Sequence, residues 1–271
     1  MVSKLTDTTF STTYKDDFRD SDNYHRILFN SGRALQAREL TQMQTVIQKE
    51  IERFANNVFR TGSQVNPAGL TLNTNMEFVK LAGNPDVSDF AVGQTITEAT
   101  TGIAGRITRI ESYISYEEPT TFYINYTNTS GGTTGDAFGD REQSVRFTPG
   151  ATLTNGNGTA VTVQTTDTAL NAATGIGSSV SVSTGSFYAA GHFVQCNPQT
   201  IMIDRYFAYP TTMIGFKVVQ QIVTADDDDA LYDNQAVLPN ETAPGADRYR
   251  IQLVLTTEYD LDSDNNFVYL N

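Results

Sequence analysis

Carboxylates are the most closely spaced reactive side chains in the sequence. Asp226–Asp229 places four of them in a row, and carboxylate oxygens are ligands that Ca²⁺ accepts. Adjacent residues cannot all point at one ion, so a solvated turn before a short helix is the favoured interpretation. A second run, Asp260–Asp264, matches the first three ligand positions of an EF-hand loop, but Asn265 and Asn271 stand where that loop needs Gly and Glu. The sequence thus predicts no metal site, although Ca²⁺ binding by the acidic runs stays open.

Other groups that commonly carry catalysis are isolated. His25 and His192 are the two histidines, and neither has a Ser or Cys nearby in a catalytic pattern. Cys196 has no basic neighbour that would activate its thiol. Gly175 and Gly177 could open a dinucleotide-binding loop, but the third glycine of that pattern is missing and no helix follows. We therefore expect a protein that is not an enzyme and binds no cofactor.

Tyrosines in the middle of the chain offer a binding chemistry. Tyr113, Tyr116, Tyr123 and Tyr126 have Asn, Asp and Thr neighbours, and aromatic rings beside polar groups can stack on sugars and bond their hydroxyls. The competing interpretation is that Tyr is simply a common strand residue. Glycan binding predicts exposed rings with converging polar groups, whereas a structural role predicts buried rings.

The composition excludes several classes of partner. The chain has 271 residues and a formal net charge of −13, from 31 acidic and 18 basic residues. Nucleic acids and anionic membranes bind electropositive surfaces, so the charge argues against both. The single cysteine excludes an internal disulfide, and no apolar run has the length of a membrane span. The tyrosine, phenylalanine and glycine content favours strands and turns.

Leu35–Phe59 is the one segment with a clear helical period. We expect Asn30 or Ser31 to precede its first turn and Gly62 to follow its last. The segment fits either a contact with another subunit or partner, or a helix that faces the chain's own core. The first is favoured because no second helix is predicted to pair with it. Its apolar residues follow at steps of three or four and form one stripe: Leu40, Met43, Ile47, Ile51, Phe54 and Val58.

An aromatic N-terminal arm precedes this helix. Phe10, Tyr14, Phe18 and Tyr24 are widely spaced and separated by Asp and Thr, which predicts an extended segment that lays rings on a surface. That surface is either a docking partner or the chain's own core, and the sequence leaves both interpretations open.

The rest of the chain predicts a mainly β fold, with the helix as its one long N-terminal α-helix. We expect a β-sandwich-like scaffold interrupted by a small all-β inserted module. The predicted parts are 1–82 for the arm, helix and first strands, 83–168 for the insert, and 169–271 for the β-rich continuation. The first part includes two short strands, Gly69–Leu72 and Phe78–Leu81, divided by an Asn-rich turn.

The predicted insert, 83–168, contains an internal repeat. Phe90–Thr97 recurs as Phe147–Thr154, and both copies continue with a Gly-x-Ala-x-x-hydrophobic stretch at Gly102 and Gly158. Each copy predicts a strand, a glycine turn and a second strand. The insert therefore predicts a small all-β module with two related halves.

Two stretches carry a specific resemblance to a known family. The first is Asn23–Phe59, with the recurrent part Leu35–Gln44 (Leu-Gln-Ala-Arg-Glu-Leu-Thr-Gln-Met-Gln). The second is Gly185–Val194, with Ala243–Leu253 downstream. Both are similar to a family of large tail and baseplate structural proteins of marine cyanophages and related bacteriophages. The resemblance brackets nearly the whole chain except 83–168.

This resemblance implies a non-enzymatic virion component: the N-terminal attachment region of a tail fibre or baseplate protein, located in the phage tail and assembled in the host cytoplasm. The implied partners are copies of itself, as a homotrimer, and other tail or baseplate proteins. The alternative is a receptor-binding module that contacts host surface glycan through 83–168. The host, the receptor and the baseplate neighbour are left open, and we expect the parent polypeptide to continue beyond Asn271.

Overall fold

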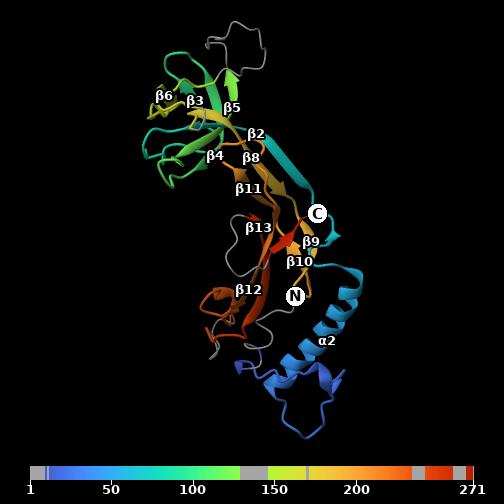
Figure 1. The fold of residues 1–271 in the computed structure, drawn as a ribbon. Helices are drawn as coiled ribbons and strands as arrows, with labels where there is room; N and C mark the ends of the chain where they lie inside the picture. The colour runs from blue at the N-terminus through green and yellow to red at the C-terminus, as the bar shows by residue number, and fades with distance from the viewer. Residues whose placement is uncertain are drawn as a thin grey trace. The chain divides into compact units, whose positions relative to one another are not determined.

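The computed structural model describes residues 10, 12–128, 146–168, 171–233, 242–258 and 267–270. In this part of the chain the fold is mainly β with one long α-helix, α2 (Ala37–Val58), as the sequence predicts (Figure 1). Two short 3₁₀ helices accompany it, η1 (Asp20–Asp22) and η2 (Asp229–Leu231). The chain forms two compact units: the first contains 1–71, 181–201 and 212–271, and the second contains 72–180 and 202–211.

The first unit contains two three-stranded antiparallel sheets. Their faces meet where the fully buried rings of Phe187 and Phe216 lie with centroids 4.8 Å apart. These two layers give the unit a sandwich-like core. The first sheet has the order β1-β9-β10, with bounds Gln64–Asn66, Gly185–Ala189 and His192–Cys196. The second has the order β13-β12-β14, with bounds Arg248–Thr257, Ile214–Val223 and Phe267–Tyr269.

An eight-stranded sheet supplies most of the second unit, in the order β11-β8-β2-β5-β4-β3-β6-β7. Leu81 and Val163, directly after β2 and β7, form an antiparallel bridge, so β2, β5, β4, β3, β6 and β7 close into a ring. The strands are β2 Leu70–Lys80, β3 Thr95–Glu98, β4 Ala104–Glu111, β5 Thr121–Asn128, β6 Thr152–Asn155, β7 Ala160–Thr162, β8 Thr174–Val182 and β11 Gln199–Asp204. Each ring strand adds a buried residue to one apolar cluster: Val79, Phe122, Ile107, Ile96, Leu153 and Val161.

The repeat in the sequence is also a repeat in the structure. β3 and β6 occupy equivalent places in the two copies and pair antiparallel, with Thr97 opposite its own equivalent, Thr154. Gly93 and Gly150, before these strands, have positive φ of 92° and 79°, which glycine adopts without steric cost. The two copies are therefore related by an approximate two-fold axis that passes between β3 and β6.

The course of β2 corrects one prediction. The sequence predicts two short strands, Gly69–Leu72 and Phe78–Leu81, whereas the structure has one strand, Leu70–Lys80. The reason is the unbroken alternation: Leu72 and Phe78 have the same parity, so no turn is needed to bring both to one face. The predicted insert, 83–168, lies inside the second unit, which continues on both sides of it.

Close packing explains a glycine of β8. A Cβ added to Gly177 would stand 2.4 Å from the carbonyl oxygen of Arg205. We expect Gly177→Ala to force the two backbones apart and to lower the free energy of unfolding by about 1–3 kcal/mol, measured by urea unfolding. Gly156→Ala is the matched control, because a Cβ there meets nothing within 4 Å. An equal loss of stability in both variants would contradict this explanation.

Candidate functional site

The first turn of α2 is fixed by a capping box. The N–H of Gln36 donates to Oε2 of Glu39 over 3.0 Å, and the side chain of Gln36 accepts from the N–H of Glu39 in return. The helix therefore starts two residues later than predicted, with Gln36 rather than Asn30 or Ser31 as its cap. Its 22 residues give a length of about 33 Å.

One face of α2 lies on the sheet β1-β9-β10 through largely polar contacts. Gln48 Nε2 donates to the carbonyl oxygen of Gly191, in the β9–β10 turn, over 2.8 Å. The Tyr188 hydroxyl donates to Oδ1 of Asn56 over 2.8 Å. The ring of Phe59, just after the helix, lies with its centroid 6.1 Å from that of Tyr188. These contacts fix α2 on its own sheet without using the apolar stripe.

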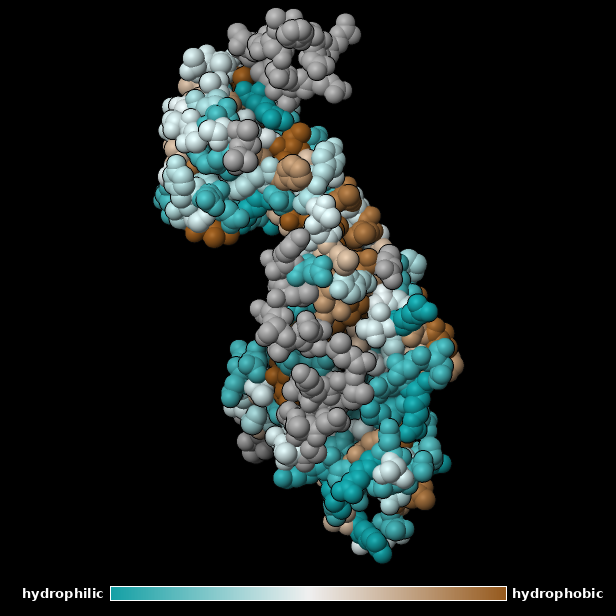
Figure 2. Space-filling view, in the orientation of Figure 1, coloured by the Kyte–Doolittle hydropathy of each residue, from teal (hydrophilic) through white to brown (hydrophobic). Residues whose placement is uncertain are grey.

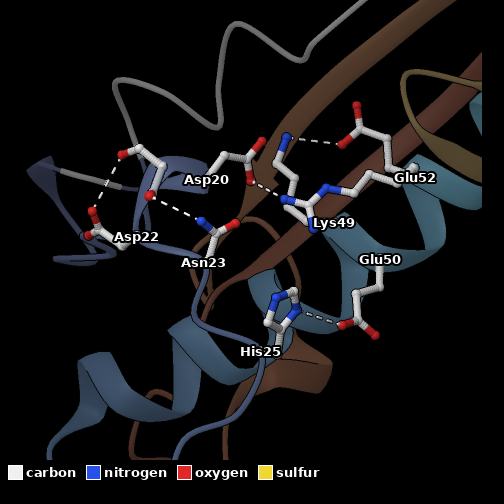
Figure 3. Close-up of polar contacts among 9 residues, drawn as sticks. Asp20, Asp22, Asn23, His25, Lys49, Glu50 and Glu52 are labelled. Carbon is white, nitrogen blue, oxygen red and sulfur yellow. Dashed lines mark hydrogen bonds and ion pairs between the residues drawn. The ribbon is translucent and has the colours of Figure 1, made fainter.

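A second face of α2 is covered by the N-terminal arm through polar and charged contacts (Figure 3). Arg53 donates to Asp20 over 3.0 Å, and His25 Nδ1 lies 3.2 Å from Oε1 of Glu50. Exposed ion pairs each contribute less than about 1 kcal/mol, so several weak contacts hold the arm in place. Further contacts join Asp16 and Asp17 of the arm to Arg38, Gln42 and Thr45 of the helix.

The third face of α2 carries the predicted apolar stripe, and all six of its side chains remain exposed among the described residues. In the view of Figure 2 the surface around α2 is largely hydrophilic, with hydrophobic groups at its edge. Within the helix only Val46 and Ala55 are buried. An apolar stripe that stays in water is typical of an interaction site. Its side chains are exposed to these fractions: Leu40 42%, Met43 39%, Ile47 55%, Ile51 41%, Phe54 69% and Val58 59%.

Two of the four rings of the aromatic arm, Phe10 and Tyr14, make specific contacts with β13 and with the residue before it. Phe10 packs edge-on against a tyrosine of β13, with ring centroids 5.2 Å apart. The Tyr14 hydroxyl donates to Oδ2 of Asp247 over 2.5 Å, and this hydrogen bond raises the pKa of Tyr14 to about 12. Phe18 is half-buried. Tyr24 is 60% exposed and is the arm ring most open to a partner.

The four tyrosines of the candidate glycan site divide into two pairs. Tyr113 and Tyr116, in the β4–β5 loop, are 41% and 70% exposed and line one cavity. Tyr123 and Tyr126 lie on β5, and burial raises the pKa of both hydroxyls. The Tyr123 hydroxyl donates to the carbonyl oxygen of Arg205 over 2.9 Å. Only the first pair is therefore placed to meet a ligand.

The Asp226–Asp229 run forms the turn after β12. Oδ2 of Asp227 accepts from the N–H and the hydroxyl of Thr224 over 3.0 and 2.8 Å, and these bonds lower the pKa of Asp227. Asp228 caps η2 by accepting from the N–H of Ala230 over 3.0 Å. The local turn thus engages these carboxylates, in line with the favoured interpretation.

The remaining reactive groups have local contacts. His192 Nδ1 lies 2.8 Å from the carbonyl oxygen of Ala190. Cys196 is buried, which raises the pKa of its thiol. Among the described residues, no group of three or more His, Cys, Asp and Glu is placed to hold a metal ion; the Asp260–Asp264 run lies outside them. None of the described helices is long and apolar enough to cross a membrane.

Three exposed apolar residues were missed by the helical period. Leu28, Phe29 and Leu35 precede α2 and are 75%, 53% and 57% exposed. They lie outside the helix, so its periodicity cannot reveal them. The available signal for Leu28 and Phe29 is the unbroken apolar run Ile27–Phe29 in an otherwise polar segment. Leu35 is predicted as the first residue of the helix and instead lies two residues before it.

Comparisons with known proteins give one family. A family model described as a domain of unknown function (DUF4815) matches residues 12–85 and 156–270, which together make up more than half of the chain. The matched residues include all of α2 and the sheet on which it lies. The unmatched stretch, 86–155, lies inside the predicted insert. Comparisons with curated proteins and with solved structures gave no significant match.

Proposed function

We propose that this chain, which belongs to the family described as a domain of unknown function (DUF4815), is a non-enzymatic attachment module of a phage tail fibre or baseplate protein. In this role copies of the chain associate through α2 and dock on neighbouring tail proteins. The resemblance of Asn23–Phe59 and Gly185–Val194 to tail and baseplate proteins supports the virion assignment. Both stretches lie within the part of the chain that the family model matches.

The observation that carries the proposal is the uncovered apolar stripe of α2. Full burial of one Leu, Ile or Phe side chain contributes roughly 1.5–3 kcal/mol, and the stripe presents six large apolar side chains on one helix. The other two faces of α2 are held by the sheet and by the arm, so the helix is positioned before any partner arrives. A preorganised surface of this kind loses little conformational entropy on association.

The proposed occupant of the stripe is a further copy of α2, and the spacing of the stripe is compatible with it. An 11-residue repeat corresponds to about 3.67 residues per turn, and helices that share it pack along one another with a right-handed supercoil. Identical helices then offer one another identical seams, which suits the homotrimer that the resemblance implies. The stripe repeats after eleven residues at three positions: Leu40 and Ile51, Met43 and Phe54, Ile47 and Val58.

The charge of the chain supports a second kind of contact. A net charge of −13 repels copies of the chain from one another wherever acidic surfaces face. A basic neighbour in the tail would turn the same charge into faster and more selective docking. We therefore expect the baseplate or tail partner to present a basic surface.

Mass spectrometry of purified virus particles that encode the chain tests the virion assignment. Tails are separated from capsids, and peptides from both fractions are identified. We expect peptides of this chain, including those from Asn23–Phe59, to be enriched in the tail fraction. Their absence from tails in which other tail proteins are detected would contradict the proposal.

A further inference from the structure

A cavity of about 230 Å³ opens beside the β4–β5 loop in the second unit. Tyr113 and Tyr116 form one wall, and Gln164, Thr165 and Thr166, just after β7, form another. The remaining lining residues are Leu81, Ala82, Gly83, Asn84 and Pro119. Typical sites for drug-sized ligands measure roughly 300–1,000 Å³, so this cavity fits one small ring rather than an extended chain.

Gln164 lines this cavity and carries a polar atom that has no hydrogen-bond partner. The residue is 7% exposed, and its Oε1 is buried without a hydrogen-bond partner. A buried acceptor that stays unpaired costs about 1–3 kcal/mol, so few such groups persist without a reason. The atom is closed to solvent, so the side chain must turn toward the cavity before a ligand hydroxyl can donate to Oε1 and recover this cost.

The rest of the lining defines the chemistry of the ligand. None of the residues that line the cavity is charged, and Glu117 and Glu118 follow Tyr116 directly, so an anionic ligand is disfavoured. Oδ1 of Asn84 accepts from the Thr120 hydroxyl over 3.3 Å, which leaves the amide N–H groups of Asn84 to donate. The required ligand is neutral, has one apolar face for a tyrosine ring and carries hydroxyls that both donate and accept.

We propose that this cavity binds one pyranose ring of a neutral saccharide. The C–H face of the sugar stacks on Tyr116 and Tyr113, one hydroxyl donates to Oε1 of Gln164, and another accepts from Asn84. Tyr123 and Tyr126 stay in the core and take no part. This site is independent of α2 and does not rest on the attachment function proposed above.

Saturation-transfer NMR on the full chain tests this site. The probes are the methyl glycosides of glucose, galactose, mannose and N-acetylglucosamine, each at millimolar concentration. We expect at least one of them to receive saturation and to bind with a measurable Kd. Tyr116→Ala should then weaken binding at least tenfold, because it removes the stacking surface from a side chain that is 70% exposed.

Two further variants sharpen the test. Tyr209→Ala is the matched control, since Tyr209 is 74% exposed in the same unit but does not line the cavity; its Kd should equal that of the unmodified chain. Gln164→Met keeps the length of the side chain and removes the acceptor, so it should weaken binding while thermal unfolding stays cooperative. The proposal is overturned if none of the four glycosides binds, or if Tyr116→Ala and Tyr209→Ala bind equally well.

Discussion

Replacing Ile47 and Ile51 with Asp should turn the assembled protein into a folded monomer. Both side chains lie in the middle of the exposed stripe of α2. In an assembly each new carboxylate would be buried among apolar side chains, and an unpaired buried charge costs several kcal/mol. A loss of about 4 kcal/mol corresponds to a roughly thousandfold weaker association. Sedimentation velocity should therefore give the mass of one chain at every concentration tested.

The same variant should keep its own fold. Neither side chain packs in the core, and exposed substitutions usually change the free energy of unfolding by less than about 0.5 kcal/mol. Circular dichroism should show the helix and strand content of the unmodified chain. Ile47→Leu with Ile51→Leu is the matched control, because it keeps the stripe apolar and should keep the assembly. An Asp variant that assembles like this control would contradict the role of the stripe, and one that unfolds would place the stripe in the core.

Phe187→Ala should act differently from the Ile47 and Ile51 variant, because its direct effect should be a loss of folding stability. The ring is fully buried between the two sheets of the first unit and meets Phe216. Removing a buried Phe side chain leaves a cavity and lowers the free energy of unfolding by about 3–5 kcal/mol. Because β9 belongs to the sheet that holds α2, we expect assembly to weaken together with the fold. Urea unfolding followed by circular dichroism measures the loss.

Phe207→Ala provides the comparison for this variant. Phe207 is 58% exposed, so the same truncation there should change the free energy of unfolding by less than about 0.5 kcal/mol. If Phe187→Ala were as stable as Phe207→Ala, the packing of the two sheets would not depend on the contact between Phe187 and Phe216.

The helix shows what periodicity can and cannot predict. Steps of three and four residues from Leu40 to Val58 are enough to place a helix within two residues of its true bounds. They also identify which residues share one face. They cannot tell what covers that face, because a core-facing and a partner-facing stripe have the same spacing. The structure adds that polar residues such as Gln48 and Asn56, through contacts with Gly191 and Tyr188, hold the helix by another side.

The tyrosines of β5 illustrate the same limit in a sheet. Tyr123 and Tyr126 are three positions apart, so their side chains point to opposite faces of the strand. The strand pattern of the sequence predicts that at most one of these two faces lies in the core. Tyr123 is fully buried and Tyr126 is partly buried, because each face of β5 is covered. Tyr126 packs against the apolar cluster of the ring, while Tyr123 reaches the backbone of Arg205 after β11. The ring closes through contacts distant in sequence, which a local pattern cannot reveal.

The mass of the unmodified chain in solution tests the central claim most directly. Light scattering over a wide range of concentrations reports how many copies associate. The proposed assembly through α2 predicts a stable species with three times the 29.7 kDa mass of the chain. A mass of one chain at every concentration would contradict self-association as the role of the exposed stripe.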